Sequence, residues 1–341
     1  MSLDYKQTLR HLCSIMSVSG CERDAAREVT EKYGSLFDSV TVDAARNIIL
    51  LKKAKKKNAQ KLMLDAHFDQ IGMIVTGITS EGLLTVAPVG GIDRVILPAS
   101  EVLVYGKKKL FGVIAATPPH LQKPGDTAAP EWSAVRVDIG YTKEEAEKLV
   151  DLGTPVCWYY SGDELMNDRI TGAGFDDKAC AAGLITAVAN TPADKLKYDV
   201  YVTLSAGEEI GGAAANNAAF TIKPDLAVVT DVNFATTPGV DEDESGKLGE
   251  GVMVSLSAVT DRRLTKNILS LAEKNNIPVS TVVEATNTGT NANHLVYVRE
   301  GIPAAVVSLP LAGMHSYNEL LDMKDADSFV KLFGEIITNE V

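Results

Sequence analysis

The sequence lacks the features that would place it among membrane, secreted or nucleic-acid-binding proteins. It has no apolar run long enough to cross a membrane, and its N-terminus, MSLDYKQTLRHLCSIM, shows charged helical periodicity instead of a secretory signal. Its 33 basic residues are outnumbered by 45 acidic ones, and the net charge of −12 argues against a nucleic-acid partner. We therefore expect a cytoplasmic protein that binds neither nucleic acid nor membrane.

Cysteines and aromatic residues are also scarce. The four cysteines (Cys13, Cys21, Cys157 and Cys180) form no CxxC pair and indicate free thiols in a reducing compartment. Aromatic residues make up 6% of the chain, with two tryptophans, which leaves few platforms for stacking sugars. The HExxH, GxSxG and GxxxxGK[ST] motifs are missing as well. What remains is the 45% hydrophobic, 23% charged composition of a soluble globular protein.

The order of apolar segments predicts an α/β domain interrupted by a β-rich insertion. Helical stripes at residues 4–16 and 22–33 precede three short strands, at residues 39–42, 48–51 and 62–64, the last leading into His67. From about residue 71 to 161, short apolar runs are broken by Gly and Pro, which is typical of a small β module. Helices and strands then alternate again, so we expect a sheet with helices on its faces. The predicted strands lie at residues 72–76, 83–86, 102–105, 112–115, 133–138, 200–204, 226–230 and 304–309, with a helix at 264–275.

Chemistry-bearing side chains follow several of these strands. His67 comes directly after a buried strand, with Asp69 two residues later, and His315 follows a strand near the C-terminus. Ligands in open α/β sheets collect beyond the carboxyl ends of the strands, so we expect these side chains to meet. The competing interpretation is a scatter of helix caps and surface charges. The other members of the predicted cluster are Asp176 and Asp177 before an alanine-rich helix, Glu208 and Glu209 after the strand YVTLS, and Asp231 at the end of the strand LAVVT.

Imidazole nitrogens and carboxylate oxygens together favour a site for two divalent ions, with zinc, cobalt or manganese as candidates. One carboxylate bridging ions ~3.5–4 Å apart would let them activate a shared water. Of the adjacent Glu208 and Glu209, one would bind metal while its neighbour takes the proton from that water. Asp69 would accept the second ring proton of His67 and fix its tautomer.

The chain resembles the M42 family of metallo-aminopeptidases, which includes glutamyl, deblocking and tetrahedral aminopeptidases and members labelled endoglucanase or cellulase M. The resemblance extends over nearly the whole chain, with its motifs in family order, and is therefore highly specific. The matching segments are AHFDQIG, PVGGIDRV, DIGYTKEEAEKL, GFDDKAC, GEEIGG, TDVNFATTPG, KLGEG and MHSYNE.

The resemblance implies a role for each candidate residue. His67 and Asp231 would bind one metal ion, Glu209 and His315 would bind the other, and Asp176 would bridge the two. Glu208 would be the general base, and Asp69 would orient His67. Asp177 would shape the peptide geometry beside the bridging ligand. The implied reaction is removal of N-terminal residues from short peptides by metal-activated water.

The resemblance also implies an architecture and an assembly. Residues 1–67 and 168–341 would form an α/β/α sandwich that carries the catalytic site. Residues 68–167 would form an inserted β-barrel domain that mediates dimerisation. Family members assemble into dimers or into dodecamers with an enclosed cavity.

Two other functions stay open, one from the endoglucanase labels of the family and one from three segments that depart from the family pattern. The segment from Thr288 to Ala292 carries Asn291 where the family usually has an aspartate, the loop from Leu311 to Met314 lacks the usual aromatic or arginine pair, and the glycines after Glu209 are compressed to Gly211-Gly212. These changes would alter the substrate pocket, so a catalytically weakened assembly protein is one alternative. A two-carboxylate glycoside hydrolase is the other, although it leaves His67 and His315 without a role.

Some polar residues outside this cluster have simpler interpretations. For His120 and His294 we expect a structural role and not a direct functional one. The acidic run at residues 241–244 is expected to be a solvated surface turn.

Overall fold

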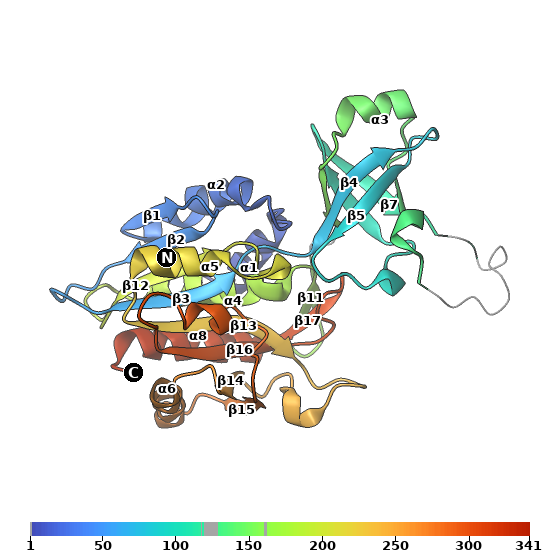
Figure 1. The fold of residues 1–341 in the computed structure, drawn as a ribbon. Coiled ribbons are helices and arrows are strands. Elements are labelled where there is room, and N and C mark those ends of the chain that lie inside the picture. The colour runs from blue at the N-terminus through green and yellow to red at the C-terminus, as the bar shows by residue number, and fades with distance from the viewer. Residues whose placement is uncertain (1, 117, 119–128, 160–161) are drawn as a thin grey trace.

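The computed structural model of the chain describes residues 2–116, 118, 129–159 and 162–341, and it joins an α/β sandwich to a closed β-barrel (Figure 1). This confirms the fold class that the sequence predicts. The helices are α1 (Tyr5–Ser14), α2 (Glu22–Tyr33), α3 (Lys143–Leu149), α4 (Phe175–Asn190), α5 (Ala214–Ile222), α6 (Arg262–Lys274), α7 (Ala292–Leu295) and α8 (Met323–Thr338). Among the residues that the structure describes, none of these helices is both long and apolar enough to cross a membrane.

An eight-stranded sheet forms the middle of the sandwich. Its four central strands, β12, β3, β13 and β16, are mutually parallel, while β1, β2 and β14 join antiparallel to their inner neighbours. The parallel strands therefore end at the same edge of the sheet. In spatial order the strands are β1 (Ser39–Val42), β2 (Ile48–Lys52), β12 (Asp199–Ser205), β3 (Lys61–His67), β13 (Leu226–Phe234), β16 (Ala304–Leu311), β14 (Val252–Ser257) and β15 (Val279–Glu284).

Both faces of the central strands are buried, which explains why they read as near-continuous apolar runs. Leu62, Leu64 and Ala66 of β3 face a core shared with α1, α2, α4, α6 and α8. The intervening Met63 faces a second core shared with α5 and α7. Side chains alternate across a strand, so two helical layers cover the sheet and make a three-layer sandwich.

The helix α4 packs unusually close to α8. It is buried on every side and rich in alanine, so its backbone approaches its neighbours closely. A Cβ atom built on Gly183 would lie 2.5 Å from Cδ1 of the Phe329 ring. Phe329 in turn contacts Phe333, with ring centroids 4.4 Å apart. The absence of a side chain at Gly183 is thus what lets the two helices meet at this distance.

The barrel stands beside one end of the sandwich (Figure 1). It has its own core, which is separate from the two cores of the sandwich. A small third sheet, β10 (Asp163–Leu165), β11 (Arg169–Gly172) and β17 (Glu319–Asp322), connects the chain leaving the barrel with the segment after His315. The barrel strands, in spatial order, are β4 (Gly72–Ile78), β5 (Leu84–Val89), β8 (Arg136–Asp138), β7 (Lys109–Ile114), β6 (Glu101–Tyr105) and β9 (Pro155–Trp158).

The insertion differs from the sequence-based prediction, which also missed the barrel strand β9. The strand predicted at residues 133–138 is split into a 3₁₀ turn, Trp132–Ala134, and a short strand, Arg136–Asp138. The insertion also contains the helix α3, which follows a capping box between Thr142 and Glu145. Local hydrogen bonding at this cap outweighs the surrounding β pattern.

Candidate metal centre and active site

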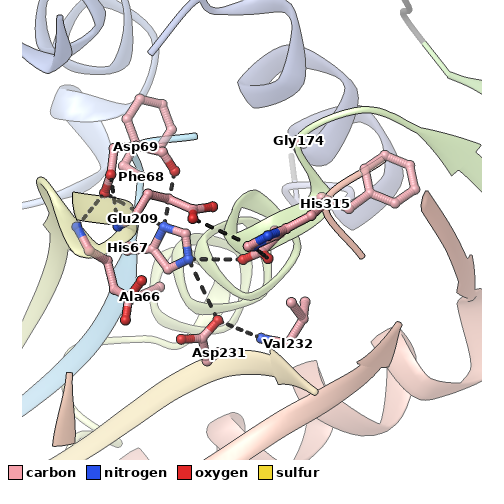
Figure 2. A network of polar contacts seen from close by, with 12 residues as sticks. Ala66, His67, Phe68, Asp69, Gly174, Glu209, Asp231, Val232 and His315 are labelled. Carbon is pink, nitrogen blue, oxygen red and sulfur yellow. Dashed lines mark hydrogen bonds and ion pairs between the residues drawn. The ribbon is translucent and has the colours of Figure 1, made fainter. Parts of the chain in front are cut away.

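The predicted side chains come together at the carboxyl edge of the parallel strands. His67 is the last residue of β3, Asp231 lies in β13, and His315 follows β16 by four residues. Glu208 and Glu209 form a 3₁₀ turn after β12, and Asp176 lies at the start of α4. Figure 2 shows His67, Glu209, Asp231 and His315 converging on one small volume.

His67 is 2% exposed and makes polar contacts through both ring nitrogens. Its Nε2 lies 2.9 Å from Oδ1 of Asp176 and 3.6 Å from Oδ1 of Asp231. Its Nδ1 lies 3.0 Å from the backbone carbonyl oxygen of Asp69. Burial alone would lower the pKa of His67, but the surrounding carboxylates raise that pKa well above its ordinary value.

His315 repeats this arrangement from the opposite side. Its Nε2 lies 3.3 Å from Oδ2 of Asp176 and 3.4 Å from Oε2 of Glu209. Its Nδ1 lies 2.9 Å from the carbonyl oxygen of Gly91, which belongs to the loop after β5 of the barrel. The interaction with Asp176 is the main reason that the pKa of His315 is raised to about 9.

These contacts define which ring atoms face the cluster. A carbonyl oxygen only accepts, so Nδ1 of each ring must donate to Asp69 or Gly91. In a neutral imidazole Nε2 then carries a lone pair, and both lone pairs point at carboxylate oxygens. Two acceptors facing one another repel unless a proton or a metal cation lies between them, and this tautomer is the one in which metal-binding histidines are held. The arrangement therefore fits a divalent cation.

The carboxylates themselves are a second feature that suits a bound cation. Oε1 of Glu209 is buried without a hydrogen-bond partner among the described residues, and the carboxylate of Asp177 is buried beside the thiol of Cys180. Burial raises the pKa of Glu208 to about 7 and that of Glu209 to about 8, the latter with help from Asp176. Burial also raises the pKa of Asp231. Crowded carboxylates of this kind are stabilised by bound cations.

Ligand atoms of His67, Asp176 and Glu209 all lie within 4.8 Å of one another, which suits a metal ion. Nitrogen and oxygen donors without a thiolate are compatible with zinc, cobalt and manganese. The Asp176–Asp177 peptide bond is cis.

The carboxylate of Asp69 holds the turn that carries the two glutamates. It accepts hydrogen bonds from the backbone nitrogens of Glu208 at 3.0 Å and Glu209 at 3.2 Å, and from Oγ of Ser19 at 2.6 Å. The same carboxylate lies 3.6 Å from Nδ1 of His67, farther than the carbonyl oxygen of Asp69. Asp69 thus contacts His67 mainly through its backbone oxygen, whereas its carboxylate binds the glutamate turn.

Sequence reasoning missed two residues that position the candidate ligands. Glu319 is buried, and its carboxylate accepts from the backbone nitrogens of Phe175 at 2.6 Å, Asp176 at 3.4 Å and His315 at 3.1 Å. Gly91 supplies the carbonyl oxygen that contacts His315, and a Cβ there would lie 3.2 Å from Nδ1 of that ring. Glu319 lies in the segment MHSYNE and Gly91 in the segment PVGGIDRV, both of which resemble the family, but the sequence alone gave neither residue a role.

The segments that depart from the family pattern lie in different places. Asn291 is 3% exposed and buried behind the site, whereas Thr288, Gly289 and Met314 line a cavity of about 610 Å³. This cavity also contains His67, Asp176, Glu208, Glu209, Asp231 and His315. His294 lies on α7, and His120 lies outside the described residues.

Comparison with known proteins identifies the family. The sequence model described as M42 glutamyl aminopeptidase matches residues 46–332. The chain belongs to this family. Among its relatives, a lysyl aminopeptidase of Pyrococcus furiosus is 30% identical over 332 residues, covering 96% of this chain and 94% of the relative.

Solved structures agree with this assignment to the M42 aminopeptidases. An aminopeptidase from the archaeon Desulfurococcus kamchatkensis superposes with a TM-score of 0.91 at 29% identity, covering 99% of this chain and 95% of that one. The TET1 peptidase of Pyrococcus horikoshii superposes with a TM-score of 0.87 at 29% identity, covering 99% and 100%. The prediction of an aminopeptidase is therefore confirmed, and the possible metal site at His67, Asp176 and Glu209 is consistent with a metal-dependent peptidase.

Proposed function

We propose that this M42 aminopeptidase binds two divalent metal ions and removes N-terminal residues from short peptides. His67 and Asp231 would hold one ion, Glu209 and His315 the other, and Asp176 would bridge them. The observation that carries the proposal is the position of Asp176, whose Oδ1 lies 2.9 Å from Nε2 of His67 while its Oδ2 lies 3.3 Å from Nε2 of His315. One carboxylate thus presents an oxygen to each ring.

Bound divalent ions would supply Lewis-acid chemistry, lowering the pKa of a water and polarising the scissile carbonyl. Glu208, which lines the same cavity, would act as the general base, because a carboxylate there can take a proton from that water and pass it to the leaving amine. Burial raises the pKa of Glu208 to about 7, close to the pH at which a base is most effective.

The remaining residues would hold these groups in place. The carbonyl oxygens of Asp69 and Gly91 keep the proton of each imidazole on Nδ1, which leaves each Nε2 free to bind metal. Glu319 ties the backbone around Asp176 to that of His315. The carboxylate of Asp69 fixes the backbone of the turn that carries Glu208 and Glu209.

We also propose that the chain works as a homo-oligomer, with residues 68–167 as the dimerisation domain and residues 1–67 and 168–341 as the catalytic domain. The TET1 peptidase of P. horikoshii is described as assembling into a tetrahedron or a large octahedral shell. A dimer or dodecamer of this chain would be distinguished by analytical ultracentrifugation. The relatives do not decide the substrate, since one is named for lysyl activity and the family for glutamyl activity.

The function can be tested by hydrolysis of a panel of aminoacyl-p-nitroanilides by metal-stripped protein, with and without added Zn²⁺, Co²⁺ or Mn²⁺. We expect metal to restore release in the wild type and the Glu208→Gln variant to lose at least about 100-fold in kcat while still binding metal. Glu250→Gln, which changes an exposed glutamate, serves as the matched control.

Other outcomes would favour the alternatives. Chelator-insensitive cleavage of a β-glucan would support the glycoside hydrolase, whose two-carboxylate chemistry needs no metal. A protein that binds two ions and assembles, yet releases nothing from any substrate, would support the weakened assembly protein. Both results would contradict the proposed peptidase.

A further inference from the structure

The cavity beside the candidate metal centre extends well beyond the metal-binding residues. The rest of its lining, called the wall below, is formed by the end of β13, the end of β15, the loop at residues 285–289, Glu244 and Met314. The proposed reaction would take place at His67 and Glu208, so a substrate side chain next to the scissile bond would reach this wall. The wall therefore bears on which N-terminal residue is accepted.

The wall is both apolar and acidic. Phe234, Val282 and Met314 supply apolar surface, while Glu244 and Glu284 supply carboxylates. The lining contains no lysine or arginine within the part of the chain that the structure describes. The acidic run at residues 241–244, expected to be a plain solvated turn, thus contributes one residue to the cavity.

Glu284 is held in place but pairs with no cationic side chain among the described residues. Its Oε1 accepts a hydrogen bond of 3.2 Å from Nδ2 of Asn233, which also lines the cavity. Its Oε2 is buried and makes no hydrogen bond of ordinary geometry among the described residues, while the Ser255 hydroxyl also interacts with this carboxylate. No salt bridge to Glu284 or Glu244 is formed within the described ranges. A half-buried carboxylate without a cation partner is costly, and a bound cation would offset that cost.

We propose that this cavity selects peptides whose N-terminal residue is lysine or arginine, an inference that rests on the proposed aminopeptidase function. The methylene groups of such a side chain pack on Phe234 and Met314, and its cationic end pairs with Glu284, with Glu244 adding to the negative field. Long basic side chains combine an apolar stem with a charged end, which matches this wall. Acidic N-terminal residues are disfavoured because they would place like charges together.

The test compares kcat/KM for the p-nitroanilides of lysine, norleucine, leucine and glutamate with metal-loaded protein. Norleucine has the same straight carbon chain as lysine without the ammonium group. We expect lysine to exceed norleucine by at least about 10-fold in the wild type, since a charge-assisted hydrogen bond contributes roughly that factor. Glu284→Gln should reduce this ratio about 10-fold while norleucine hydrolysis changes less than about twofold.

The matched control is Asp243→Asn, which removes one negative charge from the residue beside Glu244 but lies outside the cavity lining. This variant should leave the ratio of kcat/KM for lysine to that for norleucine unchanged. If the ratio fell as much as in Glu284→Gln, a general effect of negative charge would explain the preference and the proposal would be overturned. A wild type that prefers norleucine, leucine or glutamate would also overturn it while leaving the aminopeptidase function intact. Absence of release from all four substrates and from the wider panel would refute the proposed function itself.

Discussion

Nδ2 of Asn291 donates a hydrogen bond of 2.9 Å to Oδ2 of Asp65, directly behind the candidate metal centre. Asp65 lies two residues before His67 on β3, so both side chains project from the same face of that strand. Asn291 also donates to Oγ of Ser205, and both members of the pair are almost fully buried. The position at which the family usually has an aspartate here carries the amide donor that a buried carboxylate requires.

This pairing predicts that Asn291→Asp destabilises the protein. The substitution replaces a donor with a second acceptor against Asp65, and an unsatisfied buried group costs about 1–3 kcal/mol of unfolding free energy. The double variant Asp65→Asn with Asn291→Asp restores one donor and one carboxylate and should recover most of that loss. Urea unfolding of the wild type, Asp65→Asn, Asn291→Asp and the double variant, analysed as a double-mutant cycle, measures the coupling free energy between the two side chains. Asn217→Asp, at an exposed position on α5, is the control, and equal stability of Asn291→Asp and wild type would contradict the prediction.

Removing one of the two hydrogen bonds that the glutamate turn donates to Asp69 should weaken metal binding. In Asp69→Asn the side chain keeps one acceptor oxygen where the carboxylate accepts from both Glu208 and Glu209. We expect metal affinity to fall about 10–100-fold, as is usual when a group that orients ligands is lost. Competition with a chromogenic chelator measures the affinity. Ser19→Ala removes a third hydrogen bond to the same carboxylate without touching the turn, and should have the smaller effect.

Chelation should lower the melting temperature. A ligand that binds only the folded state stabilises it by about 4 kcal/mol at 1,000 times its dissociation constant. Scanning calorimetry with EDTA and then with Zn²⁺, Co²⁺ or Mn²⁺ should therefore show a loss and a recovery. His67→Ala should abolish the response to metal, and Glu284→Gln should retain it. A melting temperature that changes with neither chelator nor metal would contradict the proposed centre.

The close packing of α4 against α8 predicts opposite effects for two glycines. Gly183→Ala places a Cβ 2.5 Å from the Phe329 ring and should lower the unfolding free energy by about 1–3 kcal/mol through overpacking. Gly334→Ala on α8 meets no atom within 4 Å and should gain up to about 1 kcal/mol from its higher helix propensity. Guanidinium unfolding measures both, and a stabilised Gly183→Ala would show that the ring can shift.

The sequence by itself determined the central strands and the side chains that follow them, but it did not indicate β14 and β15. Buried apolar runs such as the one before His67 are local, and the rule that parallel strands end at one edge then places Asp231 and His315 beside it. The alternation of helices and strands was sufficient for the sandwich, and the Gly- and Pro-interrupted runs were sufficient for a β module in the insertion.

Only the tertiary structure decided which distant atoms meet within that site. The contact between Gly91 and His315 joins residues 224 positions apart, and that between Asp65 and Asn291 joins residues 226 apart. No local pattern encodes such pairs, because they depend on how the barrel loop and α7 pack against the edge of the sheet. The same holds for Glu284, whose strand the apolar pattern did not predict and which becomes part of the cavity wall only when β15 is placed beside the metal centre. Periodicity specifies the elements, whereas packing specifies the partners of their polar atoms.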